Sequence, residues 1–191
     1  LGAIKNVGSA AIESILETRD KSGPFGSFRD FCERVDLRVA NRRVIESLIK
    51  SGALDSISKN RSSMMENLSS IMERAQAKQK DRHIGQSNMF DAFEEQSSGN
   101  KPQNLITVEE WTDHERLKFE KETLGFYITG HPLVRFVKEI SWFTNSNSST
   151  LGECRNGKTV IVSGIPSKVI QKTTRKGDKM AFISLEDLHI A

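Results

Sequence analysis

The chain has 191 residues, of which 36% are apolar and 28% are charged, and its formal net charge is +3. No apolar run approaches the ~20 residues of a membrane-spanning helix and no signal peptide opens the chain, so we expect a cytoplasmic protein with no membrane partner. Basic residues outnumber acidic ones in residues 1–85 and 146–191, and acidic residues prevail between them, so the two basic ends are the candidates for a polyanion.

The residues that carry enzyme chemistry form no recognisable constellation. Cys32 and Cys154 stand apart with no nearby histidine, which argues against a zinc site or a disulfide framework and fits a reducing compartment. No phosphate-binding glycine loop and no nucleophile–base pair is visible. We therefore predict no catalytic residue, no metal site and no cofactor in these residues. Leu1 as the first residue suggests a piece of a longer chain.

An internal repeat with a spacing of 33 residues occupies residues 1–55, in which residues 4–16 align with residues 37–49. Each copy predicts a short turn followed by a helix with apolar residues at helical spacing. Gly8 and Asn41 occupy matching places, and both residue types tolerate a positive φ, while asparagine can also cap a helix.

The segment between the two copies predicts a break and then a third helix. Gly23-Pro24-Phe25-Gly26 interrupts the periodicity, and Ser27 then starts a helix. Phe28, Phe31, Cys32 and Val35 are expected to face inward from it. Gly52 is expected to end the helix of the second copy after Lys50.

Two helices joined by a tight turn form a helix-hairpin-helix, whose free backbone N–H groups can hold a phosphate without reading a base. The hairpin of the first repeat copy (the first hairpin) is the stronger candidate for DNA, because that of the second copy (the second hairpin) has no glycine at all. The first hairpin departs from the usual pattern in one place, since Asn6 stands where glycine is common. A bulky residue at Gly8 should strain the turn. The alternative is an all-helical packing unit with no ligand. The predicted contacts to duplex DNA are Lys5, Asn6, Val7, Gly8, Ser9, Arg38, Asn41, Arg42 and Arg43.

Residues 56–84 predict a loop and one long helix that completes a first domain of residues 1–84. Ser63 to Glu66 matches a capping box, which places the helix start there. From Gln76 onward the helix is polar, as if it left the body of the domain. Its apolar stripe, expected to be core, comprises Met64, Leu68, Ile71, Met72 and Ala75.

Residues 85–104 predict an exposed peptide followed by a polar linker. Two large apolar residues stand here beside polar sequence on both sides. Such a pair can fill a partner's pocket while a glutamine fixes the register, although it could also fold back onto the chain's own core. The candidate peptide is Gln86, Ser87, Asn88, Met89 and Phe90.

Residues 105–150 predict a small helical connector. Thr112 and Glu115 form a capping box, and Gly125 ends that helix. Pro132 suits the first position of the next helix, and His131 is expected to serve as a cap rather than as a base. Residues 145–150 are expected to be a second polar linker, and solvated faces are expected at Glu109, Glu110, Glu120 and Glu122.

Residues 151–191 predict strands, because the apolar period changes to two. A first strand from Val160 to about Thr173 would bend at Gly164, and a second would cover residues 180–185. This hairpin resembles the start of an OB-fold, a five-stranded barrel that binds single strands, although two strands cannot close a barrel. The basic tip, a candidate for single-stranded DNA, comprises Lys172, Arg175, Lys176 and Lys179.

Four stretches in order, residues 2–8, 41–55, 85–90 and 122–133, resemble the C-terminal region of the bacterial DNA polymerase III alpha subunit family. The resemblance implies a tandem helix-hairpin-helix on duplex DNA, a sliding-clamp (beta subunit) peptide at residues 86–90, and an OB-fold beginning near Gly157. It also implies other holoenzyme subunits as partners. The parent would be a DNA-directed DNA polymerase whose catalytic carboxylates lie outside these residues.

The expected fold is therefore mainly α: a tandem helix-hairpin-helix domain, a small helical connector, and the first β-hairpin of an incomplete OB-fold. Two other functions remain open. A helix-hairpin-helix module of a repair or recombination protein would account for residues 1–55 only. A protein-interaction adaptor without DNA binding is the second, and a titration with duplex DNA separates it from both DNA-binding functions.

Overall fold

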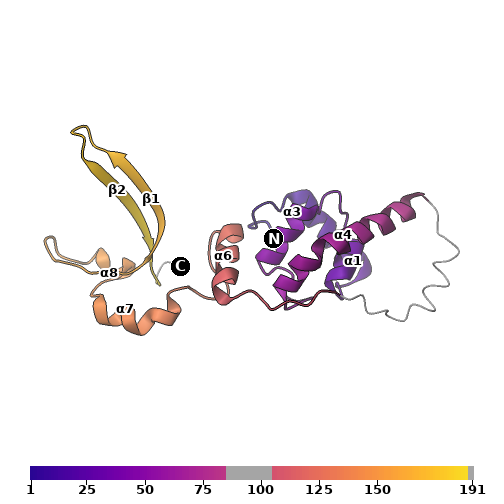
Figure 1. Ribbon diagram of the computed structural model, residues 1–191, viewed down its shortest axis with the longest axis horizontal. Coiled ribbons are helices and arrows are strands. Elements are labelled where there is room, and N and C mark those ends of the chain that lie inside the picture. Colours follow the sequence, from indigo (N-terminus) through magenta and orange to yellow (C-terminus); the bar gives the residue numbers. More distant parts are fainter. Residues whose placement is uncertain (85–104, 189–191) are drawn as a thin grey trace. The chain divides into compact units, whose positions relative to one another are not determined.

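A computed structural model describes residues 1–84 and 105–188 of the chain (Figure 1). The chain divides into two compact units, Leu1–Tyr127 and Ile128–Ala191. The first is helical and the second carries a two-stranded antiparallel sheet. Residues 105–127 therefore group with the N-terminal unit, which differs from the predicted boundaries at residues 104 and 150. Among the helices of the described ranges, none is both long and apolar enough to cross a membrane.

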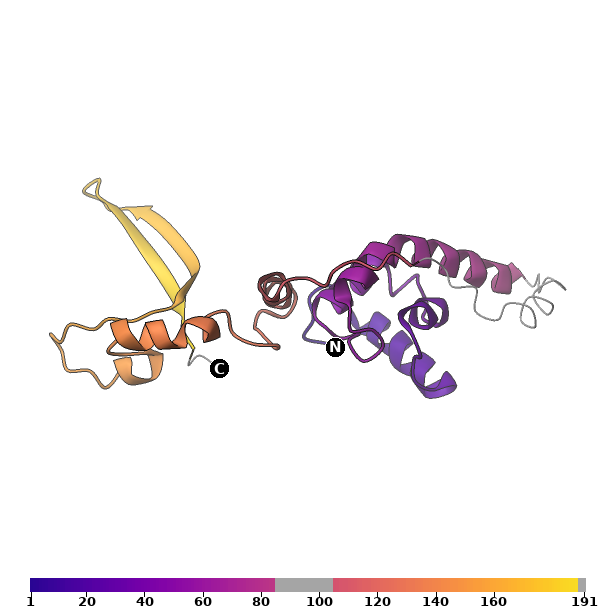
Figure 2. The same cartoon turned by 60° about the horizontal axis from the view of Figure 1, so that its bottom comes forward.

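Within its described residues, the first unit consists of one long helix and four shorter ones. Figures 1 and 2 show the C-terminal end of the long helix, α4, extending beyond the other helices. Most of its packing is against α2 and α3. The helices are α1 (Ser9–Ser22), α2 (Phe28–Arg34), α3 (Arg42–Lys50), α4 (Arg61–Ile84) and α6 (Asp113–Leu124).

The 33-residue repeat builds the core of this unit, because equivalent residues of the two copies are buried. Full burial of such an aliphatic side chain contributes roughly 1.5–3 kcal/mol, so the repeat supplies a large part of the driving force for folding. The predicted stripe of α4 and the inward face of α2 join the same cluster. The buried equivalent pairs are Ile4 and Leu37, Val7 and Ala40, Ala11 and Val44, and Ile15 and Leu48.

Local signals set most of the helix ends as predicted. The Ser27 and Asn41 side chains cap α2 and α3 by accepting hydrogen bonds from Asp30 N–H and Val44 N–H. The capping box at Thr112 forms, and Gly52 and Gly125 follow α3 and α6 with positive φ. The start of α4 differs from the prediction. It begins at Arg61, where Oδ1 of the Asn60 side chain accepts from Ser63 N–H at 2.7 Å, so the apparent capping box at residues 63–66 is helix interior.

The left-handed residue of the first turn is Asn6 rather than Gly8. Asn6 has a φ of +68°, whereas Gly8 is the N-cap of α1 with an extended backbone at φ −79°. A Cβ added at Gly8 would meet nothing within 4 Å. The prediction that a bulky residue at Gly8 strains the turn is therefore wrong, and the strained position is one that asparagine tolerates better than most residues.

The chain returns after residue 104 along the first turns of α4. The Asn67 side chain binds both backbone groups of Ile106, at 2.8 and 2.9 Å. The Glu110 carboxylate accepts from Arg61 N–H and Ser62 N–H, so it caps α4. Glu110 was predicted to lie on a solvated face, and that prediction is wrong. Its hydrogen-bond partners lie 48 and 49 residues earlier in the chain, so no local pattern could identify them.

A buried ion pair fastens α6 to this assembly. The Arg61 and Glu120 side chains are 4% and 0% exposed, and Arg61 Nη1 lies 3.0 Å from Glu120 Oε1. The same guanidinium bonds both oxygens of Asp55, at 2.6 and 2.8 Å. The prediction of a solvated Glu120 is thus also wrong. Gly52 makes room for this contact, since a Cβ there would lie 2.1 Å from Arg61 Nη2.

The second unit has no buried residue among its described residues, 128–188. Strands β1 (Ile165–Thr173) and β2 (Lys179–Glu186) pair antiparallel, with an irregularity between Pro166 and Lys168. The turn between the two strands contains Gly177, whose φ is +91°. Its helices are the 3-10 helix η1 (Val134–Phe136), α7 (Val137–Phe143) and α8 (Ser148–Leu151).

Three predictions for this unit differ in detail from the structure. Residues 160–164 lie outside the sheet, so β1 is shorter than predicted. Residues 148–151, predicted as linker, form α8 behind a capping box at Asn147. Pro132 precedes a 3-10 turn rather than starting an α-helix. An antiparallel hairpin is what the structure bears out, and the OB-fold stays a prediction.

The buried ion pair leads to a stability prediction. Replacement of Arg61 by leucine leaves Glu120 buried without its cation, which should cost about 3–5 kcal/mol of unfolding free energy. The double change Arg61→Leu with Glu120→Leu should recover part of that loss. Urea unfolding followed by far-ultraviolet circular dichroism measures both. Lys21→Ala, which breaks the exposed pair with Glu17, is the control and should change stability by less than about 1 kcal/mol. An equally small effect of Arg61→Leu would contradict the prediction.

Candidate nucleic-acid interface

The N-terminus of α1 is an open set of hydrogen-bond donors. Gly8 provides no side-chain cap, and its carbonyl accepts from Ala11 N–H and Ile12 N–H at 3.2 Å. Within the described residues, the N–H groups of Gly8, Ser9 and Ala10 donate no hydrogen bond, and all three residues are exposed. A helix end of this kind carries about half a positive charge and favours an anion.

The rest of the first hairpin presents one cation and fixes its own backbone. Lys5 is exposed and its side chain makes no ion pair within the described residues, while its N–H donates to Thr123 O of α6 at 2.8 Å. The Asn6 side chain donates to Ser47 Oγ of α3 at 3.2 Å. Val7 is buried. Among the five predicted contacts of this hairpin, Lys5, Gly8 and Ser9 therefore stay available, whereas Asn6 and Val7 hold the turn in place.

The second hairpin has a different chemistry at equivalent positions. The Asn41 side chain occupies the N-terminus of α3, since its Oδ1 accepts from Val44 N–H at 3.2 Å. The Arg38 guanidinium bonds both oxygens of Asp36, the nearer at 2.7 Å. Arg42 contacts Glu46. Arg43 is exposed and has no ion pair in the part of the chain that the structure describes.

The two hairpins therefore differ in how much of their positive charge is already neutralised. Lys5 and the N-terminus of α1 meet no carboxylate in the described residues, whereas Arg38 and Arg42 each hold one. Hydrogen bonds from Arg38 to Asp36, together with their charge attraction, raise the pKa of the arginine above its ordinary value. The arrangement favours the first hairpin for an incoming phosphate.

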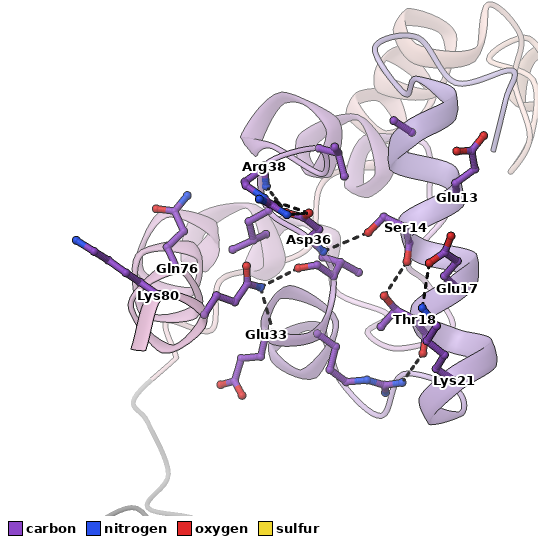
Figure 3. Close-up of a pocket in the computed structure, with 16 residues that line it drawn as sticks. Glu13, Ser14, Glu17, Thr18, Lys21, Glu33, Asp36, Arg38, Gln76 and Lys80 are labelled. Atoms are coloured by element: carbon purple, nitrogen blue, oxygen red, sulfur yellow. Dashed lines mark hydrogen bonds and ion pairs between the residues drawn. The ribbon is translucent and has the colours of Figure 1, made fainter. Parts of the chain in front are cut away.

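A hollow of about 1100 Å³ lies between α1, α4 and the loop that follows α2 (Figure 3). Figure 3 shows Glu13 and Glu17 on the α1 side and Gln76 and Lys80 on the opposite side. The lining thus mixes both charge signs, which does not favour a polyanion. Gln79 of α4 also lines the hollow. Its side-chain amide donates to three backbone carbonyls near the end of α2, and the shortest of these hydrogen bonds is 2.8 Å.

Ion pairs also hold the polar end of α4 onto α2. Lys78 Nζ lies 2.8 Å from Glu33 Oε2, and Arg29 bonds the other carboxylate oxygen of the same residue. Burial raises the pKa of Glu33, but hydrogen bonds from Lys78 and Arg29 outweigh it and leave that pKa below its ordinary value. The polar half of α4, predicted to leave the domain at Gln76, therefore remains docked at least as far as Gln79.

The remaining predicted site residues fall into two groups. The peptide of residues 86–90 lies outside the described residues. The basic tip is exposed at all four of its residues, and one of them, Lys172, places Nζ 5.6 Å from the centroid of the Phe182 ring. His131 Nδ1 accepts from Leu133 N–H at 3.2 Å, a local contact with the backbone two residues further along the chain. Among the described residues, no group of histidine, cysteine and carboxylate side chains could hold a metal ion.

Sequence reasoning missed the residues that support the first hairpin from behind. The Thr123 carbonyl receives the Lys5 N–H, and Glu120, one turn earlier in α6, anchors that helix to Arg61. No local pattern identifies these contacts, because each joins segments that are far apart in the sequence. The thiol of Cys32 is buried, and burial raises its pKa to about 12, so this thiol is unreactive.

Comparison with known proteins connects this geometry to a family. Residues 1–64 match the family model described as a helix-hairpin-helix motif. The DNA polymerase III subunit alpha of Borreliella burgdorferi is 40% identical over 189 residues, that of Vibrio cholerae 37% over 191, and that of Escherichia coli K12 34% over 188. Each alignment covers 98% of this chain. The resemblance to the DNA polymerase III alpha subunit is confirmed. The chain spans 16% of the length of each of these relatives, about one sixth.

Proposed function

We propose that this chain is the part of a bacterial DNA polymerase III alpha subunit that holds duplex DNA without reading its sequence and binds the sliding clamp. The whole protein would be a cytoplasmic DNA-directed DNA polymerase of the replication holoenzyme. These residues would contribute grip and tethering rather than a catalytic group. The observation that carries the DNA contact is the uncapped N-terminus of α1 beside Lys5.

The physical basis of the DNA contact is a phosphate bound by backbone donors. Three N–H groups and the end of the α1 dipole converge at residues 8–10, and exposed Gly8 has no side chain to block an approaching sugar-phosphate backbone. Lys5 adds a full charge that no carboxylate in the described residues neutralises. Such contacts do not touch base edges, so affinity should be independent of sequence and should fall steeply with salt.

The clamp contact rests on residues 86–90 and on the way their flanks are held. The helix α4 runs to Ile84 on one side, and on the other side the chain is bonded to α4 from Ile106 onward. Both flanks of these residues therefore belong to the same N-terminal unit. Burial of Met89 and Phe90 in a partner's pocket would contribute roughly 1.5–3 kcal/mol for each side chain. Gln86 would set the register through its amide.

A single-stranded DNA contact is the third element of the proposal, through an OB-fold that the hairpin β1–β2 would begin. Lys172 and Phe182 lie on one face of this hairpin, since Ile170 pairs with Phe182 and alternate residues share a face. A lysine beside an exposed aromatic ring suits a stacked base and its phosphate. A helix-hairpin-helix module of a repair protein and an adaptor without DNA binding are not favoured by the comparisons.

The duplex proposal predicts opposite effects of one substitution on stability and on binding. In Gly8→Asp the new carboxylate should cap α1 and raise stability by a few tenths of a kcal/mol. It should also weaken duplex binding roughly tenfold or more, because it takes N–H groups whose bonds to a charged phosphate are worth about 1.5–3 kcal/mol each. Fluorescence anisotropy with two unrelated duplexes measures binding, and thermal unfolding measures stability.

Gly8→Asn is the matched control, because asparagine caps the equivalent helix α3 without a charge. Its effect on binding should be smaller than that of Gly8→Asp. Lys5→Ala should reduce the log–log salt slope by about 0.9, the value for one phosphate contact. If Gly8→Asp binds duplex as tightly as the parent, the N-terminus of α1 is not the phosphate site.

The clamp proposal predicts that Met89→Ala with Phe90→Ala abolishes clamp binding and leaves duplex binding unchanged. The reason is that the two side chains supply most of the apolar area of a five-residue contact. Surface plasmon resonance on an immobilised sliding clamp, with duplex anisotropy on the same proteins, measures both. The control is Ser87→Ala, which should retain the clamp. Full clamp binding by the double variant would place the tether elsewhere in the chain.

The single-strand proposal predicts that two strands are not enough. This chain should bind an oligothymidine weakly, because neither edge of β1–β2 is covered in the described residues. A longer version that completes the barrel should bind more tightly, and Phe182→Ala should weaken it by about 1–3 kcal/mol, the worth of one stacked base. Equal binding by the short and long versions would show that barrel closure is irrelevant.

A further inference from the structure

We propose that the second hairpin is a second phosphate site, held closed by the carboxylates of Asp36 and Glu46. The inference rests on the proposed duplex contact of the first hairpin and adds a residue-level account of why the two hairpins are unequal. In this account Asp36 and Glu46 compete with the duplex for Arg38 and Arg42, so the two arginines contact phosphates in only a fraction of the bound complexes.

The repeat places the second hairpin's arginines where the first hairpin has its open phosphate site. With the spacing of 33 residues, Arg38 is equivalent to Lys5 and Arg42 is equivalent to Ser9. Lys5 and Ser9 lie at the hairpin and at the first position of α1, beside the free N–H groups. Arg38 and Arg42 are therefore in the right part of the structure for a phosphate, and they carry more charge than their counterparts.

Both arginines are held by specific bonds rather than left in solvent. Arg38 forms a two-point contact with Asp36, with Nη2 at 2.7 Å from Oδ2 and Nε at 3.0 Å from Oδ1. Arg42 Nε lies 2.7 Å from Glu46 Oε1, and its Nη1 lies 2.7 Å from Ser69 Oγ on α4. Part of each guanidinium's donor set is thereby occupied, so fewer donors remain for a two-point contact with a phosphate.

These contacts can open, because the two arginines lie at the surface. Their side chains are 80% and 57% exposed, and ion pairs between exposed side chains are weak. A phosphate carries the same geometric match to a guanidinium as a carboxylate does. A duplex already held at the first hairpin would raise the local phosphate concentration and compete with Asp36 and Glu46.

The repeat also provides the control for generic charge effects. Glu13 is equivalent to Glu46, but its neighbour four residues earlier is Ser9 rather than an arginine. Glu13 is exposed and forms no ion pair within the described residues. Removal of the Glu13 charge changes the net charge as Glu46→Gln does, at the equivalent place on α1, without releasing any arginine.

The test is the salt dependence of duplex binding by the full chain. Asp36→Asn with Glu46→Gln should steepen the log–log slope by up to about 1.8, which corresponds to two added phosphate contacts. Glu13→Gln should leave the slope unchanged. Arg38→Gln with Arg42→Gln should cancel the steepening in the Asp36→Asn, Glu46→Gln background and should cost less affinity in the parent. Thermal unfolding checks that every variant is folded, and each amide replacement retains one of the two acceptor oxygens.

Two results would overturn the inference. One is an unchanged slope in the Asp36→Asn, Glu46→Gln variant while Gly8→Asp still weakens the parent, which leaves the first-hairpin contact standing alone. The other is a steeper slope that Glu13→Gln reproduces, or one that loss of Arg38 and Arg42 does not cancel. Either outcome would mean that the slope responds to net charge alone. A parent whose duplex binding is insensitive to Gly8→Asp would instead overturn the proposed function, and this inference with it.

Discussion

The first unit depends on the contacts of the Arg61 guanidinium, because they join three segments that are far apart in the sequence. It bonds Asp55 from the connection after α3 and Glu120 from α6, and it belongs to the first turn of α4. Burial of an ion pair gives little net stability, since desolvation of both charges offsets their attraction. Its value lies in geometry. The hydrogen bond from Arg61 to Glu120 holds α6 against the start of α4, and the two bonds to Asp55 hold the guanidinium itself in place.

That placement decides the backbone of the first hairpin. Thr123 lies one turn beyond Glu120, and its carbonyl takes the Lys5 N–H at 2.8 Å. The neighbouring Asn6 then holds a positive φ and bonds Ser47. Because the turn is braced from α6 and α3 at once, α1 begins without a capping side chain and still keeps a defined start. The second hairpin needs no such support, since Asn41 caps its own helix.

The sequence predicts what is local and fails where partners are distant. Ser27, Asn41 and the Thr112–Glu115 box were readable because a cap and its target lie within three residues. Glu110 and Glu120 were misread as solvated because their partners lie 49 and 59 residues away. At the candidate site, the sequence singled out Lys5 and the α1 N-terminus, which the structure leaves exposed, but it gave the wrong conformational reason at Gly8. Of the two partners of Arg42, Glu46 could be predicted from the sequence because it stands at i+4. The other partner, Ser69 of α4, could be identified only from the fold.

Gly8 and Asn41 are the N-cap residues of equivalent helices, and only Asn41 provides a side-chain cap. One repeat copy shows that a side-chain cap fits this position, and asparagine there is worth only a few tenths of a kcal/mol more than glycine. The lack of a side-chain cap on α1 therefore costs little unfolding free energy. It also leaves the N–H groups of the helix end available to an anion. A single phosphate contact of this kind is weak in isolation. In a chain that also holds a clamp encircling the same duplex, as proposed for residues 86–90, the contact becomes effectively intramolecular and local concentration replaces intrinsic affinity. Weak, sequence-independent contacts are then an advantage, because they can be released and remade as the protein moves along DNA.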